Sequence, residues 1–419
     1  MAAAPQTAGT GKGLIGWIDQ RFPLTKLWND HVAEYYAPKN FNFWYFFGAL
    51  SLLVLANQIV TGIFLTMSYK PSATEAFASI EYIMRDVEWG WLIRYMHTTG
   101  ASAFFIVVYL HMFRALLYGS HRKPRELVWI FGCLIFLLLM AEAFMGYVLP
   151  WGNMSFWGAQ VIVSLFGSLP VIGSTLVEWI RGDYNIADPT LNRFFALHVA
   201  ALPLALVFLV IAHIMALHEV GSNNPDGIDI KKHKDADGHP LDGVPFHPYY
   251  TVKDLMGTAG FLIIFAAVIF FAPNFFGLFL ESPNFEMANP LQTPPDITPV
   301  WYFTPFYAML RAIPSAFGTQ VWGVMVMGAA VLVLFFVPWL DKSPVRSIRY
   351  KGPIYKVMLA LFSVSFICLA VCGMKPPSGI YPILARICTA VYFAFFLLMP
   401  WYTKFDRVKP EPERVTGHV

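Results

Sequence analysis

Two histidines, His97 and His111, lie within one apolar run, GWLIRYMHTTGASAFFIVVYLHMFRALLYGS. At 3.6 residues per turn and about 1.5 Å per residue, their spacing is close to four full turns, which places both imidazoles on one face of a helix, about 21 Å apart. Arg94 precedes the first histidine by three residues and Arg114 follows the second by three, so each arginine lies one turn nearer the water. A lone histidine in a helix is usually a core residue, but this pattern predicts two metal-bearing groups stacked across a membrane.

Composition agrees with a membrane location. Hydrophobic residues make up 57% of the 419 residues and charged residues only 13%, which is typical of a polytopic membrane protein. The net charge of +3 is too small to indicate a nucleic-acid partner. Four cysteines without a CxxCH motif exclude covalent haem attachment and a cysteine-bound cluster.

We therefore expect an all-α fold with eight transmembrane helices. The expected spans are residues 43–67, 90–118, 126–149, 190–218, 256–276, 319–339, 354–373 and 380–401. Residues 1–35 would form a disordered tail, up to residue 12, and an amphipathic interfacial helix. The other expected parts are a four-helix bundle (36–220), an inner loop (221–255), the last four helices with a long outer loop (256–403) and a polar tail (404–419).

Positive charge predicts the orientation. Lysines and arginines concentrate in the loops that would be cytoplasmic, in HRKPRE (121–126) and around Lys231, Arg346 and Lys404. Acidic residues concentrate in the opposite loops, which places both termini in the cytoplasm. The expected helices 90–118 and 190–218 then run in the same direction, from outside to inside.

The expected helix 190–218 carries a second histidine pair, His198 and His213. His97 would face His198 near the outer surface, and His111 would face His213 near the inner one. The second spacing is one residue longer than the first, a 15-residue step, which leaves an angular offset of about 60° on a regular helix. Pro203 can kink the helix and absorb part of that offset.

Glycines in the other two bundle helices repeat the same period. Gly48 and Gly62 have the same separation as His97 and His111, and so do Gly132 and Gly146. Glycine is common in membrane spans for packing reasons, but two pairs at the histidine period predict flat surfaces for two large planar groups. A planar iron macrocycle with two neutral imidazole ligands is haem b, so we expect two non-covalent, bis-histidine b haems.

The outer loops are long and apolar. The segment between the expected spans 126–149 and 190–218 is broken by Pro150, Gly152, Pro170 and Gly173, which predicts two short helices on the outer surface. The segment between 276 and 319 is rich in proline and aromatic residues, which predicts a rigid wall followed by a short helix. Such loops suit a lipid-soluble substrate, although plain interfacial packing is an alternative.

Several motifs together resemble cytochrome b of the cytochrome bc complex (ubiquinol:cytochrome c reductase, complex III). The resemblance extends over residues 30 to 403. The motifs are GWLIRYMH with its second histidine at 111, GYVLPWGNMSFWGAQVI, NRFFALH, HEVGSNNPDG, PFHPYYTVKD and PVWYFTPFYAMLRAIP.

The resemblance implies site residues. His97 and His198 would bind the low-potential haem, and His111 and His213 the high-potential haem. The quinol-oxidation pocket would lie on the outer side, at Phe144, Tyr147, Gly158, Pro299, Trp301, Tyr302 and Tyr307. Quinone reduction would take place on the inner side, near His218, Ser222, Lys253 and Asp254. A histidine and an aspartate at an aqueous edge also suit proton delivery to a quinone, although His218 could simply interact with a helix dipole.

The sequence departs from the family pattern in two places. Where the family commonly has Pro-Glu-Trp-Tyr, this chain has Val300, which cannot accept a proton; we expect Asp296 to take that role. The 15-residue histidine step is one longer than in mitochondrial members. The insert KKHKDADGHPLDG in the inner loop also suggests a bacterial member.

The implied function is a protonmotive Q cycle in a bacterial inner membrane. Arg94, Arg114 and Arg193 would hold haem propionates. A Rieske iron-sulfur protein and a membrane-anchored c-type cytochrome would be partner subunits, the substrate would be ubiquinol or menaquinol, and the complex would be a homodimer. Two alternatives remain: a dihaem membrane anchor of a dehydrogenase, and a proton-coupled transporter whose histidines relay protons.

Overall fold

The computed structural model describes residues 13–315 and 319–417, and within them the fold is predominantly α-helical. The expected disordered tail at 1–12 lies outside the described residues. Seven helices are long and apolar enough to cross a membrane, and up to eight if α15 and α16, which meet at an angle of 60°, form one broken span. When α15 and α16 are counted as one span, the structure has the eight spans of the predicted all-α fold.

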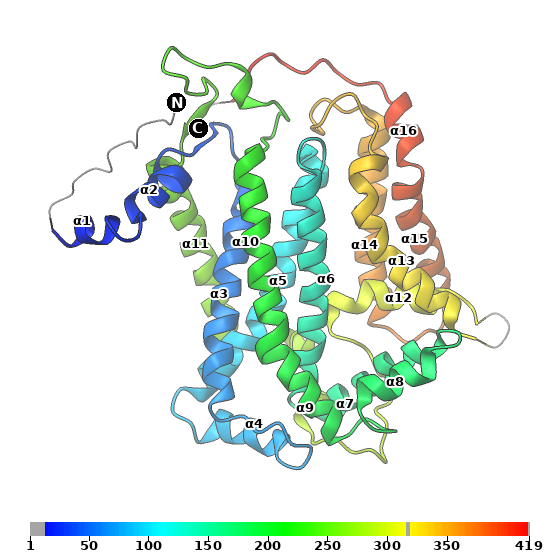
Figure 1. Ribbon diagram of the computed structural model, residues 1–419. Helices are drawn as coiled ribbons and strands as arrows, with labels where there is room; N and C mark the ends of the chain where they lie inside the picture. Colours follow the sequence, from blue (N-terminus) through cyan, green and yellow to red (C-terminus); the bar gives the residue numbers. More distant parts are fainter. Residues whose placement is uncertain (1–12, 316–318, 418–419) are drawn as a thin grey trace.

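The helices run mostly parallel to one long axis (Figure 1). The long helices are α3 (Phe46–Thr66), α5 (Gly90–Tyr118), α6 (Glu126–Val148), α10 (Leu202–Val220), α11 (Phe246–Phe271), α13 (Val321–Leu340), α14 (Pro353–Gly373) and α15 (Tyr381–Leu397). The shorter ones are α1 (Leu14–Asp19), α2 (Leu24–Trp28), α4 (Ala76–Arg85), α7 (Asn153–Leu165), α8 (Gly173–Arg181), α9 (Asp188–Ala196), α12 (Thr304–Ala312) and α16 (Met399–Phe405). Two short strands, β1 (Tyr36–Pro38) and β2 (Gly243–Pro245), pair antiparallel.

The first four spans pack as the sequence predicts. Helix α3 lies against α5, and α6 lies against α10. The fourth span is one continuous stretch, Asp188–Val220, that joins α9, a π-helical turn at Leu197–Ala201 and α10. The predicted limits of these four spans agree with the structure to within a few residues.

The fifth span differs most from its predicted limits of 256–276. Helix α11 begins earlier, at Phe246, because a helix can continue beyond the apolar stretch into the aqueous region. It ends at Phe271, and Ala272 then leaves the helical conformation with φ −149° and ψ 56°. Pro273 follows Ala272, and a proline disfavours helical geometry in the residue before it.

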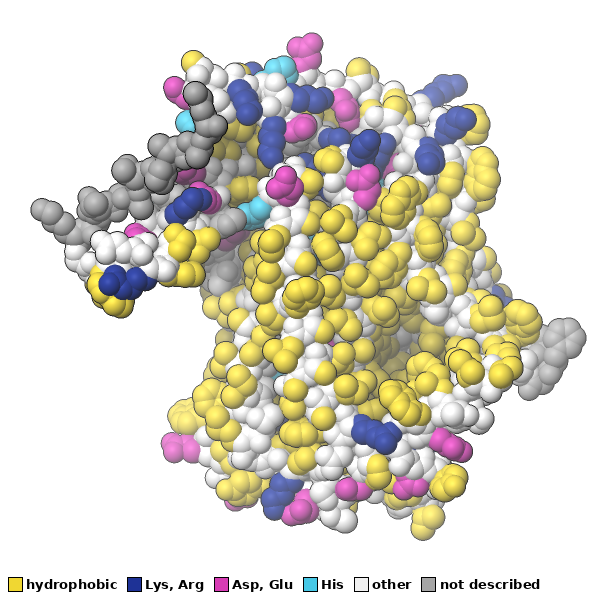
Figure 2. All heavy atoms as spheres, in the orientation of Figure 1, with side chains coloured by type: hydrophobic (Ala, Val, Ile, Leu, Met, Phe, Trp, Pro, Cys, Tyr) yellow, Lys and Arg dark blue, Asp and Glu magenta, His cyan; other side chains and the backbone are white. Residues whose placement is uncertain are grey.

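The two ends of the molecule differ in structure. One end carries the short helices α4, α7 and α8, so the two short helices predicted after the third span are present (Figure 1). The other end carries the loop 221–245 and the C-terminal residues, and lysine and arginine side chains gather there (Figure 2). We call this second end the inner face and the first the outer face, following the charge-based prediction. Between them, the visible surface is dominated by hydrophobic side chains (Figure 2).

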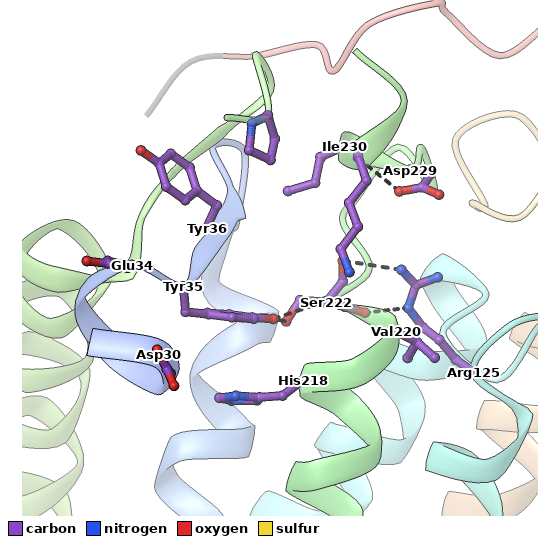
Figure 3. A pocket seen from close by; sticks show the side chains of 13 residues that line it. Asp30, Glu34, Tyr35, Tyr36, Arg125, His218, Val220, Ser222, Asp229 and Ile230 are labelled. Carbon is purple, nitrogen blue, oxygen red and sulfur yellow. Dashed lines mark hydrogen bonds between the residues drawn. The ribbon is translucent and has the colours of Figure 1, made fainter. Parts of the chain in front are cut away.

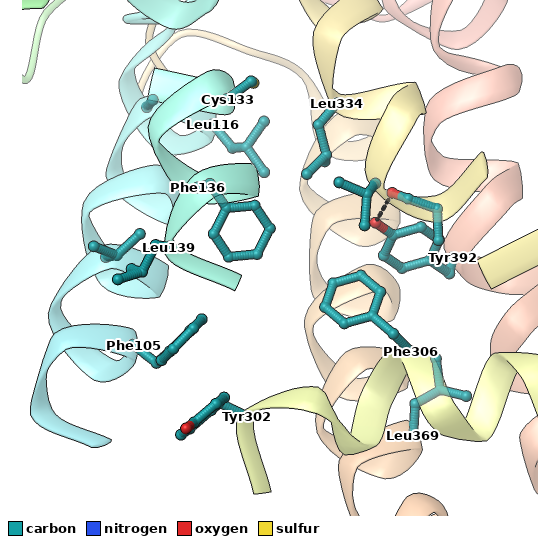
Figure 4. Close-up of a cluster of buried hydrophobic side chains, with 14 of the residues drawn as sticks. Phe105, Leu116, Cys133, Phe136, Leu139, Tyr302, Phe306, Leu334, Leu369 and Tyr392 are labelled. Carbon is teal, nitrogen blue, oxygen red and sulfur yellow. Dashed lines mark hydrogen bonds between the residues drawn. The ribbon is translucent and has the colours of Figure 1, made fainter. Parts of the chain in front are cut away.

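One hydrophobic core joins the two groups of helices. Phe105 on α5 and Phe136 on α6 lie opposite Phe306 on α12 and Tyr392 on α15 (Figure 4). The Tyr392 hydroxyl donates a hydrogen bond to the backbone carbonyl of Ala330, at 2.8 Å, so its polar end is satisfied within the core. The outer loop between α11 and α13 reaches into this core through Tyr302, whose ring stacks on Phe105.

Candidate functional site

The structure brings the four predicted histidines together in two pairs. The rings of His97 and His198 have centroids 6.1 Å apart, and those of His111 and His213 are 6.3 Å apart. His97 and His111 both lie on α5, and the other two lie on the span Asp188–Val220. The structure thus places His97 beside His198 and His111 beside His213, as the sequence predicts.

A π-helical turn accounts for the 15-residue step. His198 lies within the π-helix Leu197–Ala201, whose turn contains one residue more than an α-helical turn. Because of this extra residue, His198 and His213 lie on nearly the same face of their helix. His97 and His111 achieve the same alignment on a regular helix, since their step is one residue shorter. The sequence predicted that a kink at Pro203 would absorb part of the angular offset. In the structure, Pro203 occupies the first turn of α10, directly after the π turn. Because proline has no N–H to donate, it suits a point where the α-helical bonding is interrupted.

Each of the four predicted glycines faces one of the four imidazoles. A Cβ atom at Gly48 would lie 3.4 Å from Cε1 of His111, and one at Gly62 would lie 3.3 Å from Cε1 of His97. On α6, a Cβ at Gly132 would lie 3.5 Å from His213. At Gly146 it would overlap Cε1 of His198, closer than any side chain tolerates. The four glycines therefore let the backbones of α3 and α6 approach the imidazole rings closely.

The paired rings fit a six-coordinate iron between two imidazoles. An imidazole nitrogen binds a metal ion at about 2.0 Å, so two such bonds and the two ring radii span about 6 Å between centroids. Both measured separations match this value. The glycine-lined surfaces of α3 and α6 leave room for a planar macrocycle beside the rings. These residues would hold two b haems without covalent attachment.

The three arginines expected near propionates lie in different surroundings. Arg94 is buried on α5, one turn from His97. Arg114 has its Nη2 atom 3.3 Å from Nδ1 of His111 and its guanidinium over the Tyr45 ring. Arg193 is exposed and donates a hydrogen bond to the backbone carbonyl of Trp179. Arg94 and Arg114 thus lie close to the histidine pairs, while Arg193 is held by the outer helix α8.

Two of the predicted outer pocket residues, Trp301 and Tyr302, form an aromatic wall. Tyr302 is buried and its ring stacks on Phe105 at 3.9 Å, while the indole nitrogen of Trp301 donates to Ser102 Oγ at 3.1 Å. The other members make contacts of their own, and Phe144 belongs to a second hydrophobic cluster. Phe144 lies edge-on to Phe194 at 5.7 Å, a Cβ at Gly158 would lie 3.8 Å from the Tyr147 ring, Pro299 directly precedes the buried Val300, and Tyr307 donates to the Ile297 carbonyl at 3.2 Å.

The acidic group on this wall is one that the sequence analysis missed. The side chain of Asp296, the expected proton acceptor, is exposed. Glu281 instead accepts a hydrogen bond from the Tyr147 hydroxyl at 3.1 Å. Burial raises the pKa of Glu281 to about 7. Its position far ahead of Val300 in the chain, in a loop without regular structure, gives no sequence signal for this contact.

On the inner face, a cavity of about 180 Å³ contains two of the four predicted residues, His218 and Ser222 (Figure 3). Tyr35 stacks on His218 with ring centroids 4.6 Å apart, and its hydroxyl lies 3.0 Å from Ser222 Oγ. Arg125 donates from Nε to the Gly221 carbonyl at 2.8 Å. Burial, with a contribution from Arg346, lowers the pKa of Arg125 to about 10, so Arg125 stays charged at neutral pH.

The other two predicted inner residues, Lys253 and Asp254, do not line this cavity. Both lie on α11, where Lys253 is placed over the Tyr250 ring at 5.5 Å. The residues that the sequence analysis missed are Tyr35 and Arg125, together with Asp30, Glu34, Asp229 and Lys231 on the rim. They come from three separate segments, which only the pairing of β1 with β2 and the folded inner loop bring together.

Comparisons with known proteins support the same assignment over most of the chain. Residues 32–221 match the family Cytochrome b/b6/petB, and residues 287–393 match Cytochrome b(C-terminal)/b6/petD. Cytochrome b of Allochromatium vinosum is 63% identical over 407 residues, covering 96% of this chain and 98% of the relative. A Bradyrhizobium diazoefficiens protein named "Cytochrome b/c1" is 45% identical, covering 96% of this chain and 56% of that protein.

A solved structure agrees as well. A chain of the "Hyperthermophilic respiratory Complex III" superimposes with a TM-score of 0.86 at 38% identity, covering 94% of this chain and all of that one. The family match and the relatives cover both halves of the molecule, including all four paired histidines. The chain belongs to the cytochrome b/b6 family.

Proposed function

We propose that this protein is the membrane electron-transfer subunit of a quinol:cytochrome c oxidoreductase. The observation that carries the proposal is the pair of histidine sites, with ring separations of 6.1 and 6.3 Å, stacked along one long helix between an aromatic wall and an inner cavity. Electrons from a quinol oxidised on the outer side would pass along this axis to a quinone on the inner side. This is the arrangement that a protonmotive Q cycle requires.

Two b haems, one for each histidine pair, would supply one-electron transfer when bound. The four paired histidines would be the ligands of these haems. Gly48, Gly62, Gly132 and Gly146 make room beside the rings. Arg94 and Arg114 would bind propionates, and Arg193 would do so only if its guanidinium left the Trp179 carbonyl.

On the outer side, Tyr147 and Glu281 would receive the proton released by quinol. The carboxylate of Glu281, already hydrogen-bonded to Tyr147, is held in a partly buried position where its pKa of about 7 suits proton exchange near neutral pH. Tyr302, Trp301 and Pro299 would enclose the quinol ring. We propose Glu281 in this role rather than the exposed Asp296.

On the inner side, His218, Ser222 and Tyr35 would bind a quinone and supply protons to it. The hydroxyls of Tyr35 and Ser222 already face each other across the cavity. Lys253 and Asp254, on the neighbouring helix α11, would serve as a relay from the aqueous side and not as direct ligands. Either ubiquinone or menaquinone fits this chemistry.

The electron acceptors would be partner subunits. With four cysteines, all unpaired where the structure describes them, and no CxxCH motif, the chain offers neither a Rieske cluster site nor a c-type haem site. We propose a Rieske iron-sulfur protein and a membrane-anchored c-type cytochrome as partners, in a homodimeric complex. The name of the Bradyrhizobium relative, "Cytochrome b/c1", supports the second partner. The loop charges support cytoplasmic termini, and the bacterial relatives support a bacterial inner membrane location.

The first test is a redox-titrated visible spectrum of the purified protein. We expect two b-type components with distinct midpoint potentials. In His111→Leu or His213→Leu, we expect the inner component to disappear while the outer one remains. A protein without haem would favour a proton-coupled transporter, and two haems without sensitivity to outer-pocket inhibitors would favour the dehydrogenase anchor. Two haems retained in either histidine variant would contradict the ligand assignment.

A further inference from the structure

The four paired histidines differ in what contacts the ring nitrogen Nδ1. For His97 the partner is the hydroxyl of Thr61, at 2.9 Å, and for His111 it is the guanidinium of Arg114, at 3.3 Å. His213 faces the backbone of Val128, and no charged side chain among the described residues bonds to its Nδ1. His198 alone of the four faces a carboxylate in the described chain: its Nδ1 lies 3.1 Å from Oε1 of Glu142 and 3.0 Å from the backbone carbonyl of the same residue.

Glu142 occupies an unusual place for an acid. It is the one charged residue of α6 beyond its first turn, in the sequence LLLMAEAFMGYV, and its side chain is only 16% exposed. Its second oxygen, Oε2, is buried without a hydrogen-bond partner in the described chain. A carboxylate within a membrane span is costly, so its presence there indicates a function.

The helix holds this carboxylate in register with the ring. Gly146, one turn after Glu142, is the residue that lets α6 approach His198 most closely, since any Cβ there would overlap the ring. The ring of His198 is thus held by contacts with two consecutive turns of α6. In such a position, a hydrogen bond to the far nitrogen fixes the orientation of the ring and raises its basicity as a metal ligand.

We propose that Glu142 is a positioning residue that lowers the midpoint potential of the outer haem through its carboxylate, which lies 3.1 Å from His198 Nδ1. The inference rests on the proposed function, since it requires a haem at the His97–His198 pair. A more basic ligand and a nearby negative charge both stabilise the oxidised iron, which makes the outer haem the better electron donor. An arginine lies near each pair, Arg94 one turn from His97 and Arg114 beside His111, so Glu142 is the charge that differs between the two pairs.

Glu142 contributes to the direction of the transmembrane electron path. It favours the oxidised state at the outer pair, whereas the corresponding position at the inner pair is Val128, which carries no charge. The contribution comes from the surroundings of the histidines and not from the histidines themselves, which are present at both sites.

The first experiment is a redox titration of Glu142→Gln in the intact complex, followed by its visible spectrum. Glutamine keeps the size and an acceptor oxygen but removes the charge, so we expect the outer component to become easier to reduce by at least tenfold in equilibrium constant. That change corresponds to about 59 mV for a one-electron couple. The inner component should not shift. Glu126→Gln, which removes the acid at the other end of α6, is the matched control and should not shift the outer component.

The converse variant uses the repeat of α6 that relates Gly132 to Gly146. Val128 precedes Gly132 by four residues, as Glu142 precedes Gly146, so it is the counterpart of Glu142 beside His213. Val128→Glu should make the inner component harder to reduce and leave the outer one unchanged. This variant decides the matter if Glu142→Gln fails to assemble.

The outcomes separate the two proposals. Absence of both haems from the unmodified complex would contradict the proposed function. Two haems in the unmodified complex, with an unshifted outer potential in Glu142→Gln, would overturn the role of Glu142 alone. An inner potential in Val128→Glu that stays the same or rises would also overturn it. Opposite shifts confined to the expected components would support it.

Discussion

Glu281 shows how a single buried side chain can supply a chemical group that a neighbouring motif lacks. Val300 is buried and apolar, so the wall formed by Pro299, Trp301 and Tyr302 carries no acid of its own. Glu281 reaches the same wall from the preceding loop and accepts a hydrogen bond from Tyr147. Burial raises its pKa to about 7, so at neutral pH it is present in both protonated and ionised forms.

Glu281→Gln should slow quinol oxidation by roughly a hundredfold, within the range for removal of a general base. A carboxylate accepts a proton only when ionised, so in the unmodified protein the rate should rise as the pH increases through about 7, the pKa of Glu281. In Glu281→Gln this rise should be absent. The measurement is steady-state quinol:cytochrome c reductase activity of the complex between about pH 5.5 and 8.5.

Asp296→Asn is the matched control for this prediction. Its side chain is exposed, so the variant should keep both the rate and the pH dependence. Loss of the pH-dependent rise in Asp296→Asn, with normal behaviour in Glu281→Gln, would restore the assignment made from the sequence. The two variants thus decide between a buried and an exposed acceptor.

Residues with a regular spacing could be predicted from the sequence, and residues joined only by folding could not. The histidines and glycines repeat along helices, so their faces follow from helix geometry. Tyr35, Arg125 and Glu281 lie in loops or at helix ends, where no periodicity relates them to His218 or Tyr147. Glu142 was visible as an acid in an apolar helix, but its partner lies 56 positions away.

At the scale of helices, the close contact of α6 with the fourth span depends on glycine. Gly146→Ala would place a methyl group against Cε1 of His198, closer than real Cβ atoms approach. Such overpacking typically costs about 1–3 kcal/mol or displaces the crowded group. We expect the variant to lose the outer haem component and keep the inner one, as measured by the reduced-minus-oxidised spectrum.

Two other glycines provide the control for this substitution. A Cβ at Gly260 on α11 or at Gly328 on α13 would meet nothing within 4 Å. Gly260→Ala and Gly328→Ala should therefore keep both haem components, although each also replaces a helical glycine in a membrane span. Loss of a component in these variants as well would indicate a general effect of alanine and not a contact with His198.

Helix faces could be predicted more reliably than helix irregularities. The 15-residue step from His198 to His213 indicated that the helix must deviate, but a proline kink and a π turn both satisfy that requirement. The structure has the π turn, at Leu197–Ala201. Similarly, the apolar stretch located the fifth span, whereas the polar beginning of α11 carries no hydropathy signal for a helix.

At the scale of the whole molecule, the C-terminal residues 406–417 form a strap across the inner face, drawn in red in Figure 1. Arg414 donates two hydrogen bonds to Asp242, at 2.7 and 3.0 Å, and the backbone N–H of Thr416 donates to Asp226 at 2.8 Å. Val415 packs against Ile228 and Ile230. Since Ile230 also lines the inner cavity, the end of the chain helps to hold the wall of that cavity in place.

Removal of residues 414–419 should therefore loosen the inner loop without affecting the outer side. The deletion removes Thr416 from Asp226 and Arg414 from Asp242, although Arg349 still contacts the first acid and Lys39 the second. We expect amide hydrogen exchange in residues 226–242 to become at least tenfold faster, and a short-chain quinone to bind the inner cavity more weakly. Reduction of the outer haem by quinol should be unchanged, since Tyr147 and Glu281 lie at the opposite end. Glu413→Ala, which truncates an exposed side chain of the strap itself, should leave exchange in the loop at its original rate. Unchanged exchange in the deletion variant would mean that the inner loop holds its shape without the strap.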